Sequence, residues 1–222
     1  MVNDAMTEHE KHYTLGEDIA SSVVHGLGFV LGIVELILLV VFSSLEGDPW
    51  LIVSCSVFGL TIVVLYGAST MYHSLRGTKS RYVFRILDHS SIFFLIAGTY
   101  TPYTLVVLRG VWGWILFGIV WLGFILGTVF KSIAVKKLKI ISTILYVAMG
   151  WVILIALKEL IIRTPTGALI LLLIGGLAYT AGVPFYAIKK IPYNHAIWHV
   201  FVLAGTTFHF LSVFLFIIPL LS

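Results

Sequence analysis

The stretch NHAIWHVFVLAGTTFHFLSVFLFIIPLL, residues 194–221, decides the fold of this chain. Its apolar part exceeds the ~20 residues that a helix needs to cross the hydrocarbon core of a bilayer, so it predicts a membrane-spanning helix. It opens with two histidines four residues apart, His195 and His199. On a helix this spacing places both imidazoles on one face, where they can share one metal ion. Alternatively, they are interfacial histidines that hydrogen-bond headgroups or neighbouring helices.

The composition of the whole chain is that of a membrane protein. Of its 222 residues, 59% are hydrophobic and only 11% are charged, which leaves too little polar surface for a soluble domain of this size. Seven apolar runs are long enough to span a bilayer: residues 20–42, 50–72, 86–108, 112–130, 140–157, 166–188 and 195–220. We therefore predict an all-α, polytopic protein, with a short segment over 1–19 and a single seven-helix bundle over 20–222.

The distribution of basic residues predicts the orientation. The chain has 14 lysines and arginines, and only Arg109, Lys158 and Arg163 fall on the side opposite the N-terminus. The positive-inside rule therefore places residues 1–19 in the cytoplasm and the C-terminus outside. The net charge of +4 is small and sits in the loops, so nucleic acid is not an expected partner.

Against this topology, the polar residues of the spans gather at one depth. His25, His73, Asp88 and the pair that opens the last span all fall at predicted cytoplasmic ends. Because random placement would scatter them over both ends, and ionisable groups in a membrane are costly and usually functional, this convergence indicates a site. His209 is the exception, since it lies about 15 Å deeper along its helix at 1.5 Å per residue.

The expected metal ligands are His73, His195 and His199. Three neutral imidazoles leave a fourth tetrahedral position for water, as in catalytic zinc centres, although imidazole also suits iron, copper or nickel. Asp88 is expected to bind the metal directly or to hold the metal-bound water as a base. The other roles open to Asp88 are a helix cap and a salt bridge to Arg85, three residues away.

Residues near these ligands are candidates for supporting roles. Ser69 faces the same way as His73, so it either orients a ligand or water, or bonds back to its own helix carbonyl. Ser21 and His25 share one face of the first span, where a role in the site and ordinary packing at the interface are both open. His89 points about 100° away from the preceding carboxylate and is expected to be structural.

Three other features concern the bundle itself. Glu35 lies in the middle of the first span, so it is expected to be protonated or to face the bundle interior. The sequence GTYTP at 98–102 should kink or loosen the third span, because proline removes a helical hydrogen bond. Gly26, Gly28 and Gly32 permit close approach of a neighbouring helix.

Four motifs occur in order along the chain: Ser69-x-x-x-His73, LDHS at 87–90, AGTYTP at 97–102 and HAIWH at 195–199. Together they resemble the motifs of the bacterial hemolysin III proteins, which belong to the progestin and adipoQ receptor superfamily. The resemblance covers nearly the whole chain. In that family the first motif reads Glu, then Asn, then His, and here Ser21 stands where the Asn is expected.

The resemblance implies a zinc ion held by His73, His195 and His199, with Asp88 contacting it through water. It also implies a cavity that opens toward the inner leaflet of a bacterial cell membrane, with membrane lipids as partners and a lipid substrate entering from that leaflet. Eukaryotic relatives are linked to ceramide hydrolysis, and bacterial ones to membrane lipid homeostasis.

Three functions stay open at this point. The first is a zinc-dependent hydrolase of lipid amide or ester bonds, with Asp88 and Ser69 as catalytic residues. The second is a lipid-sensing or homeostasis protein in which zinc is structural, which a direct bond from Asp88 to the metal would favour. The third is a cytolytic pore, as the family name implies. We rank the pore last because the outer halves of the spans hold few polar groups.

Overall fold

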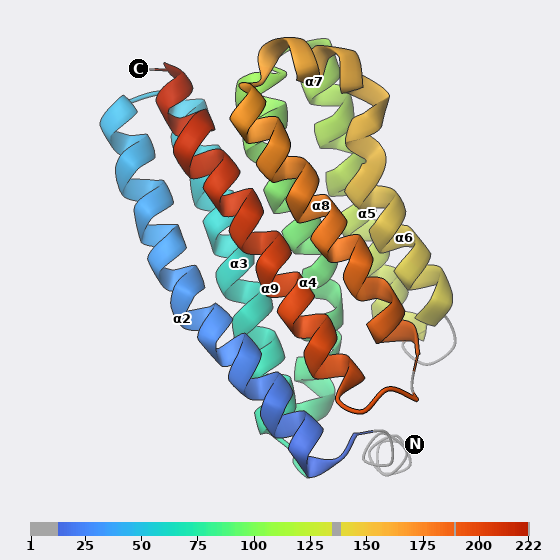
Figure 1. Ribbon diagram of the computed structural model, residues 1–222. Helices are drawn as coiled ribbons and strands as arrows, with labels where there is room; N and C mark the ends of the chain where they lie inside the picture. The colour runs from blue at the N-terminus through green and yellow to red at the C-terminus, as the bar shows by residue number, and fades with distance from the viewer. Residues whose placement is uncertain (1–12, 135–138, 189, 222) are drawn as a thin grey trace.

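The computed structural model describes residues 13–134, 139–188 and 190–221, and it forms a bundle of long helices (Figure 1). The main elements are α2 (Leu15–Glu46), α3 (Pro49–Ser74), α4 (Ser80–Pro102), α5 (Val111–Ala134), α6 (Lys139–Trp151), α7 (Leu157–Arg163), α8 (Thr166–Ala187) and α9 (Asn194–Ser212). Seven spans are long and apolar enough to cross a membrane, and the described residues contain no strand. The prediction of an all-α, seven-helix, polytopic membrane protein is confirmed, whereas its orientation stays a prediction.

The first span is longer than hydropathy alone predicts, because its helix begins at Leu15 and not near residue 20. The reason is a capping box. The backbone N–H of Glu17 donates to the hydroxyl of Thr14 (3.2 Å), and the Glu17 carboxylate accepts from the backbone N–H of Thr14 (2.8 Å). These bonds satisfy helix-end donors and start the helix in polar sequence. The early start places Asp18 inside α2, where it is 2% exposed.

Three spans depart from regular helix in the half of the bundle away from the N-terminus of α2, and the seventh does so as a π-helix over Val213–Ile217. After Pro102 the third span continues as a π-helix over Tyr103–Val107, which agrees with the predicted loosening. The fifth span breaks into α6, a 3₁₀ segment over Val152–Ala156, and α7. At this break the Tyr100 hydroxyl donates to the carbonyl of Gly150 (2.8 Å) and accepts from the backbone N–H of Ile153 (2.9 Å).

The helices pack unevenly. α2 packs closely on α3, α3 on α4 and α8 on α9, whereas α6 meets α4, α5 and α8 only loosely. Glycines allow the close pairs: a Cβ on Gly28 would lie 2.7 Å from the Tyr66 ring, and one on Gly32 would lie 2.8 Å from Ile62. Gly26 has room for a side chain, so only two of the three predicted glycines are needed. The loose packing around α6 leaves space for the cavities described below.

Candidate metal centre

The three predicted ligands meet at one end of the bundle, which we call the histidine end. It is formed by the start of α2, the end of α3 and the starts of α4 and α9 (Figure 1). His73 lies in the last turn of α3, and His195 and His199 lie in the first turns of α9. All three are buried, and their ligand atoms lie within 4.8 Å of one another. The Nε2 atoms of His195 and His199 are 3.0 Å apart.

The start of α9 is held in place by the residues around it. Tyr193 adopts a left-handed conformation with φ of 55°, which turns the chain into the helix. The side-chain amide of Asn194 then donates to the carbonyl of Phe185 on α8 (2.7 Å). These two features fix the position from which His195 and His199 extend.

The rings of two ligands are oriented by oxygen acceptors. Nδ1 of His73 lies 3.0 Å from Oδ1 of Asp18, and Nδ1 of His199 lies 3.4 Å from the carbonyl oxygen of Ser21. Each ring therefore carries its proton on Nδ1 and leaves Nε2 as an electron-pair donor. Nε2 of His73 is buried and has no hydrogen-bond partner among the described residues. This is the arrangement by which metal-binding histidines are fixed in proteins, so the triad fits a metal ion.

Asp18 is the functional residue that sequence reasoning missed. Besides His73, its carboxylate accepts from Arg81, with both oxygens 2.9 Å from Nη2, and from Nη1 of Arg76 at 3.1 Å. One buried carboxylate thus joins α2 to the end of α3, to the loop that follows it and to α4. The available signal was the helix face that Asp18 shares with Ser21 and His25, at spacings of three and seven residues.

Tyr13 covers the site from outside the helices. Its ring centroid lies 4.9 Å from that of His195 and 6.3 Å from that of His73. Burial raises the pKa of the Tyr13 phenol well above its usual value, and nearby Tyr72, Tyr186 and Asp88 add to the effect. Tyr13 therefore presents a neutral ring to the site at neutral pH.

The predicted supporting residues lie near the triad. The His25 ring stacks on that of His199, with centroids 3.6 Å apart and an interplanar angle of 11°. Both His25 ring nitrogens lack a hydrogen-bond partner within the described part of the chain. Ser21 serves His199 through its backbone carbonyl, not through the hydroxyl that replaces the family's Asn. The buried Ser69 hydroxyl lies near the Asp88 carboxylate but makes no hydrogen bond within the described residues, so it does not bond back to its own helix carbonyl.

Asp88 lines the cavity next to His195 and His199 but is not part of the ligand group. It lies well inside α4, which excludes the helix cap, and within the described ranges no salt bridge joins it to Arg85. Instead its Oδ2 lies 3.1 Å from Nδ1 of His89. The expectation that His89 points away is therefore wrong: its ring turns back along α4, where Nδ1 also reaches the carbonyl of Arg85 (2.9 Å).

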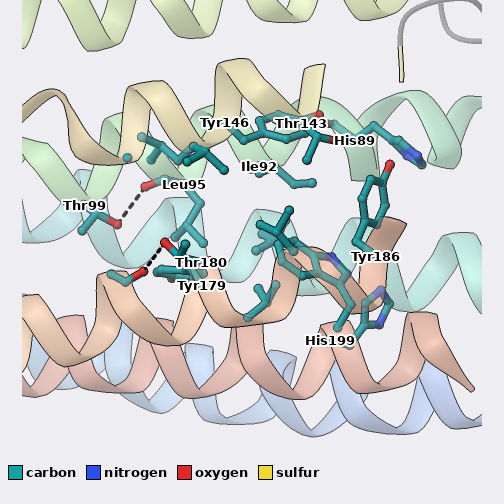
Figure 2. Close-up of a pocket in the computed structure, with 18 of the residues that line it drawn as sticks. His89, Ile92, Leu95, Thr99, Thr143, Tyr146, Tyr179, Thr180, Tyr186 and His199 are labelled. Carbon is teal, nitrogen blue, oxygen red and sulfur yellow. Dashed lines mark hydrogen bonds between the residues drawn. The ribbon is translucent and has the colours of Figure 1, made fainter. Parts of the chain in front are cut away.

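An apolar cavity of about 110 Å³ extends from the histidines into the bundle. Figure 2 shows Tyr186 and His199 at one end of it, with Thr99 and Thr180 toward the other. A second cavity of about 200 Å³ shares Tyr100, Gly150 and His209 with the first and leads toward α7. His209 is not part of the triad. Its Nε2 lies 3.0 Å from the carbonyl oxygen of Leu172.

Comparison with known proteins places the chain in a family. Residues 13–210 match the family described as "Haemolysin-III related". "Hemolysin-3 homolog" of Bacillus subtilis (strain 168) is 42% identical over 212 residues, which cover 95% of this chain and 100% of that protein. "Hemolysin-3" of Bacillus cereus is 41% identical over 219 residues, covering 98% and 100%. The human "Monocyte to macrophage differentiation factor" is 28% identical over 206 residues, covering 90% and 84%. This chain is a multi-pass membrane protein that belongs to the haemolysin-III related family.

Proposed function

We propose that the protein is a zinc-dependent hydrolase that cleaves an amide or ester bond in a membrane lipid. The observation that carries the proposal is the group of three buried histidines whose ligand atoms lie within 4.8 Å of one another. It stands at the end of a largely apolar cavity, which also presents the Asp88 carboxylate. Oriented imidazoles and an acidic group beside an apolar pocket are the parts that metal-assisted hydrolysis of a lipid requires.

His73, His195 and His199 would hold the zinc, with Asp18 and the Ser21 carbonyl fixing two of the rings. Zinc in such a site supplies a Lewis acid and a water activated near neutral pH. Asp88 would accept the proton of that water at its carboxylate and pass it to the leaving group. His89 and Ser69 would keep the Asp88 carboxylate in place.

The cavity supports a substrate with a long apolar tail. Its walls are mainly apolar, and the groups that interrupt them include Thr99, Tyr179 and Thr180. With the lipid headgroup near the histidines, the acyl tail would lie along this cavity. Burial of the apolar surface of the tail would supply the binding energy. The same walls argue against a cytolytic pore through this cavity, because an ion path needs polar groups along its length and these walls are mainly apolar.

The test combines metal content with hydrolysis. Purified protein is expected to contain about one zinc per chain, as a single three-histidine site predicts, and His195→Ala should lose it. Asp88→Asn should keep the zinc and lower hydrolysis of a lipid amide about 10²–10⁴-fold, because it removes a general base and leaves the ligands intact. Glu159→Gln, at the opposite end, is the matched control.

A structural zinc is the second candidate, because the triad joins α3 to α9 and Tyr13 covers it. It predicts that zinc removal lowers thermal stability while no lipid amide or ester is cleaved. Loss of zinc on Asp88→Asn would favour it, since that result would make Asp88 a ligand. Absence of metal from well-folded wild-type protein would contradict both candidates.

A further inference from the structure

Two buried cations at the histidine end have no acidic partner among the residues that the structure describes. Lys131, in the last turn of α5, is 3% exposed, and Arg85, in the second turn of α4, is 6% exposed. Within the described residues, no carboxylate lies within salt-bridge distance of either. Nε of Arg85 is buried without a hydrogen-bond partner in the same part of the chain. Buried charges are costly unless they are paired, so a bound anion would stabilise Lys131 and Arg85.

The neighbouring groups do not supply that anion. Lys131 Nζ lies 5.9 Å from the centre of the Tyr146 ring, and the Arg85 guanidinium lies 5.5 Å from that of Tyr82. Ring faces attract cations but carry no net charge. Asp88 acts on Lys131 through space, but no salt bridge within the described residues joins it to either cation, and its single charge cannot balance two. Arg85 also acts on Lys131, so the two cations repel one another.

Arg81 is the contrasting case on the same helix. Its guanidinium contacts both oxygens of Asp18 at 2.9 Å, so its charge is paired. The end of α5 favours a cation such as Lys131, because helix carbonyls there carry partial negative charge. That effect falls off within one turn and does not extend to Arg85, which lies near the start of α4.

We propose that Arg85 and Lys131 bind a phosphate group, and that it is the headgroup phosphate of an anionic membrane phospholipid. A guanidinium forms paired hydrogen bonds with phosphate oxygens, and an ammonium adds a point charge. The lipid source is favoured by the apolar residues exposed on the same two helices, Val83 and Leu87 on α4 and Val129 on α5. Their exposed side chains would contact acyl chains of the surrounding bilayer. This site does not depend on metal or hydrolysis, so it stands apart from the proposed function.

The test measures thermal unfolding of the purified protein in detergent during titration with three probes: phosphatidylglycerol, phosphatidylcholine and inorganic phosphate at matched ionic strength. We expect phosphatidylglycerol to raise the midpoint of wild type above the effect of phosphatidylcholine. Lys131→Gln and Arg85→Gln should each weaken the apparent affinity for phosphatidylglycerol about tenfold, because each removes one charge-assisted contact. Lys131→Arg should retain it.

Lys158→Gln is the matched control, because it removes the same charge from an exposed position at the opposite end. Equal affinity for phosphatidylglycerol in Lys131→Gln, Arg85→Gln and Lys158→Gln would overturn the proposal. An equal shift with inorganic phosphate, lost in the same two variants, would keep the phosphate site and overturn its assignment to a lipid. If the glutamine variants do not fold, photoactivatable phosphatidylglycerol on wild type decides: adducts on α4 and α5 support the site, and adducts only elsewhere overturn it.

Discussion

At the scale of single residues, Asp18 joins three side chains around the site by hydrogen bonds. Its carboxylate meets His73, Arg76 and Arg81, and all three contacts are 3.1 Å or shorter. A carboxylate on the far nitrogen of a metal-binding imidazole fixes the ring and makes it a stronger electron donor. Asp18 should therefore determine how tightly the triad binds its metal.

Asp18→Asn is expected to weaken zinc binding about 10–100-fold, because it removes the negative charge from His73 Nδ1 while keeping the size of the side chain. Competition with a chelator measures this affinity. Glu17→Gln is the matched control, since glutamine also completes the capping box and Glu17 makes no contact with a ligand in the described structure. Unchanged zinc affinity in folded Asp18→Asn would show that the carboxylate has no part in metal binding.

The ligands could be predicted from sequence, whereas their supports could not. His73, His195 and His199 stand out because an ionisable group in an apolar span is rare and costly. Asp18 lies in a polar stretch, among Glu17 and other residues that hydropathy assigns to the aqueous segment. The Ser21 carbonyl that meets His199 is a backbone group, and every residue has one. Such partners become visible only when the helices are placed beside one another.

At the scale of elements, the α3–α4 contact depends on a missing side chain. A Cβ on Gly98 would overlap the side chain of Thr61, which is fully buried on α3. Gly98→Ala is therefore expected to lower the free energy of unfolding by about 1–3 kcal/mol through overpacking. Thermal unfolding in detergent measures the change, at roughly 2–4 °C for each kcal/mol.

Gly118→Ala provides the matched control for this prediction. Gly118 lies in α5, and an added Cβ there would have no heavy atom within 4 Å. Alanine should raise helix stability by about 0.5–1 kcal/mol, so the two substitutions should shift the midpoint in opposite directions. Equal shifts would mean that α3 and α4 can separate at no cost.

The break in the fifth span shows why element boundaries were harder to predict than elements. Residues 140–157 contain no proline, and their apolar pattern predicts one continuous helix. The helix ends at Trp151 because the Tyr100 hydroxyl, on α4, hydrogen-bonds to the carbonyl of Gly150 and to the backbone N–H of Ile153. In the third span the cause is local, since Pro102 itself removes a hydrogen bond, and there the irregularity was predictable.

At the scale of the whole molecule, the two cavities meet at Gly150. A Cβ on this residue would have nothing within 4 Å, and the residue lines both cavities. Gly150→Leu should block the passage without disturbing the packing around it. If the proposed function holds, hydrolysis of a palmitoyl amide should fall about tenfold or more, equivalent to ~1.4 kcal/mol of lost binding, while a hexanoyl amide is cleaved as in wild type. Equal loss for both chain lengths would show that the tail does not follow this path.

The orientation of the bundle is a separate prediction, based on the basic residues of its loops. In a Cys55→Ala background, Lys158→Cys should react with a membrane-impermeant maleimide on intact cells, and Lys79→Cys only after permeabilisation. Both positions are exposed. Cys55 is the only cysteine of the chain, so the Cys55→Ala protein itself has no thiol that the maleimide could label. The reverse pattern of labelling would place the histidine end outside the cell.

The division of the triad between α3 and α9 has a consequence for the biogenesis of the protein. His73 belongs to the second span to be synthesised, whereas His195 and His199 belong to the last. A chain leaves the ribosome with its N-terminal part first. His73 is therefore already in the membrane while four more spans are translated and inserted before α9. If the triad binds a metal as proposed, the site is completed only when the seventh span is inserted. Metal binding would then require a fully translated chain, and a nascent protein stalled before α9 would lack two of the three histidines.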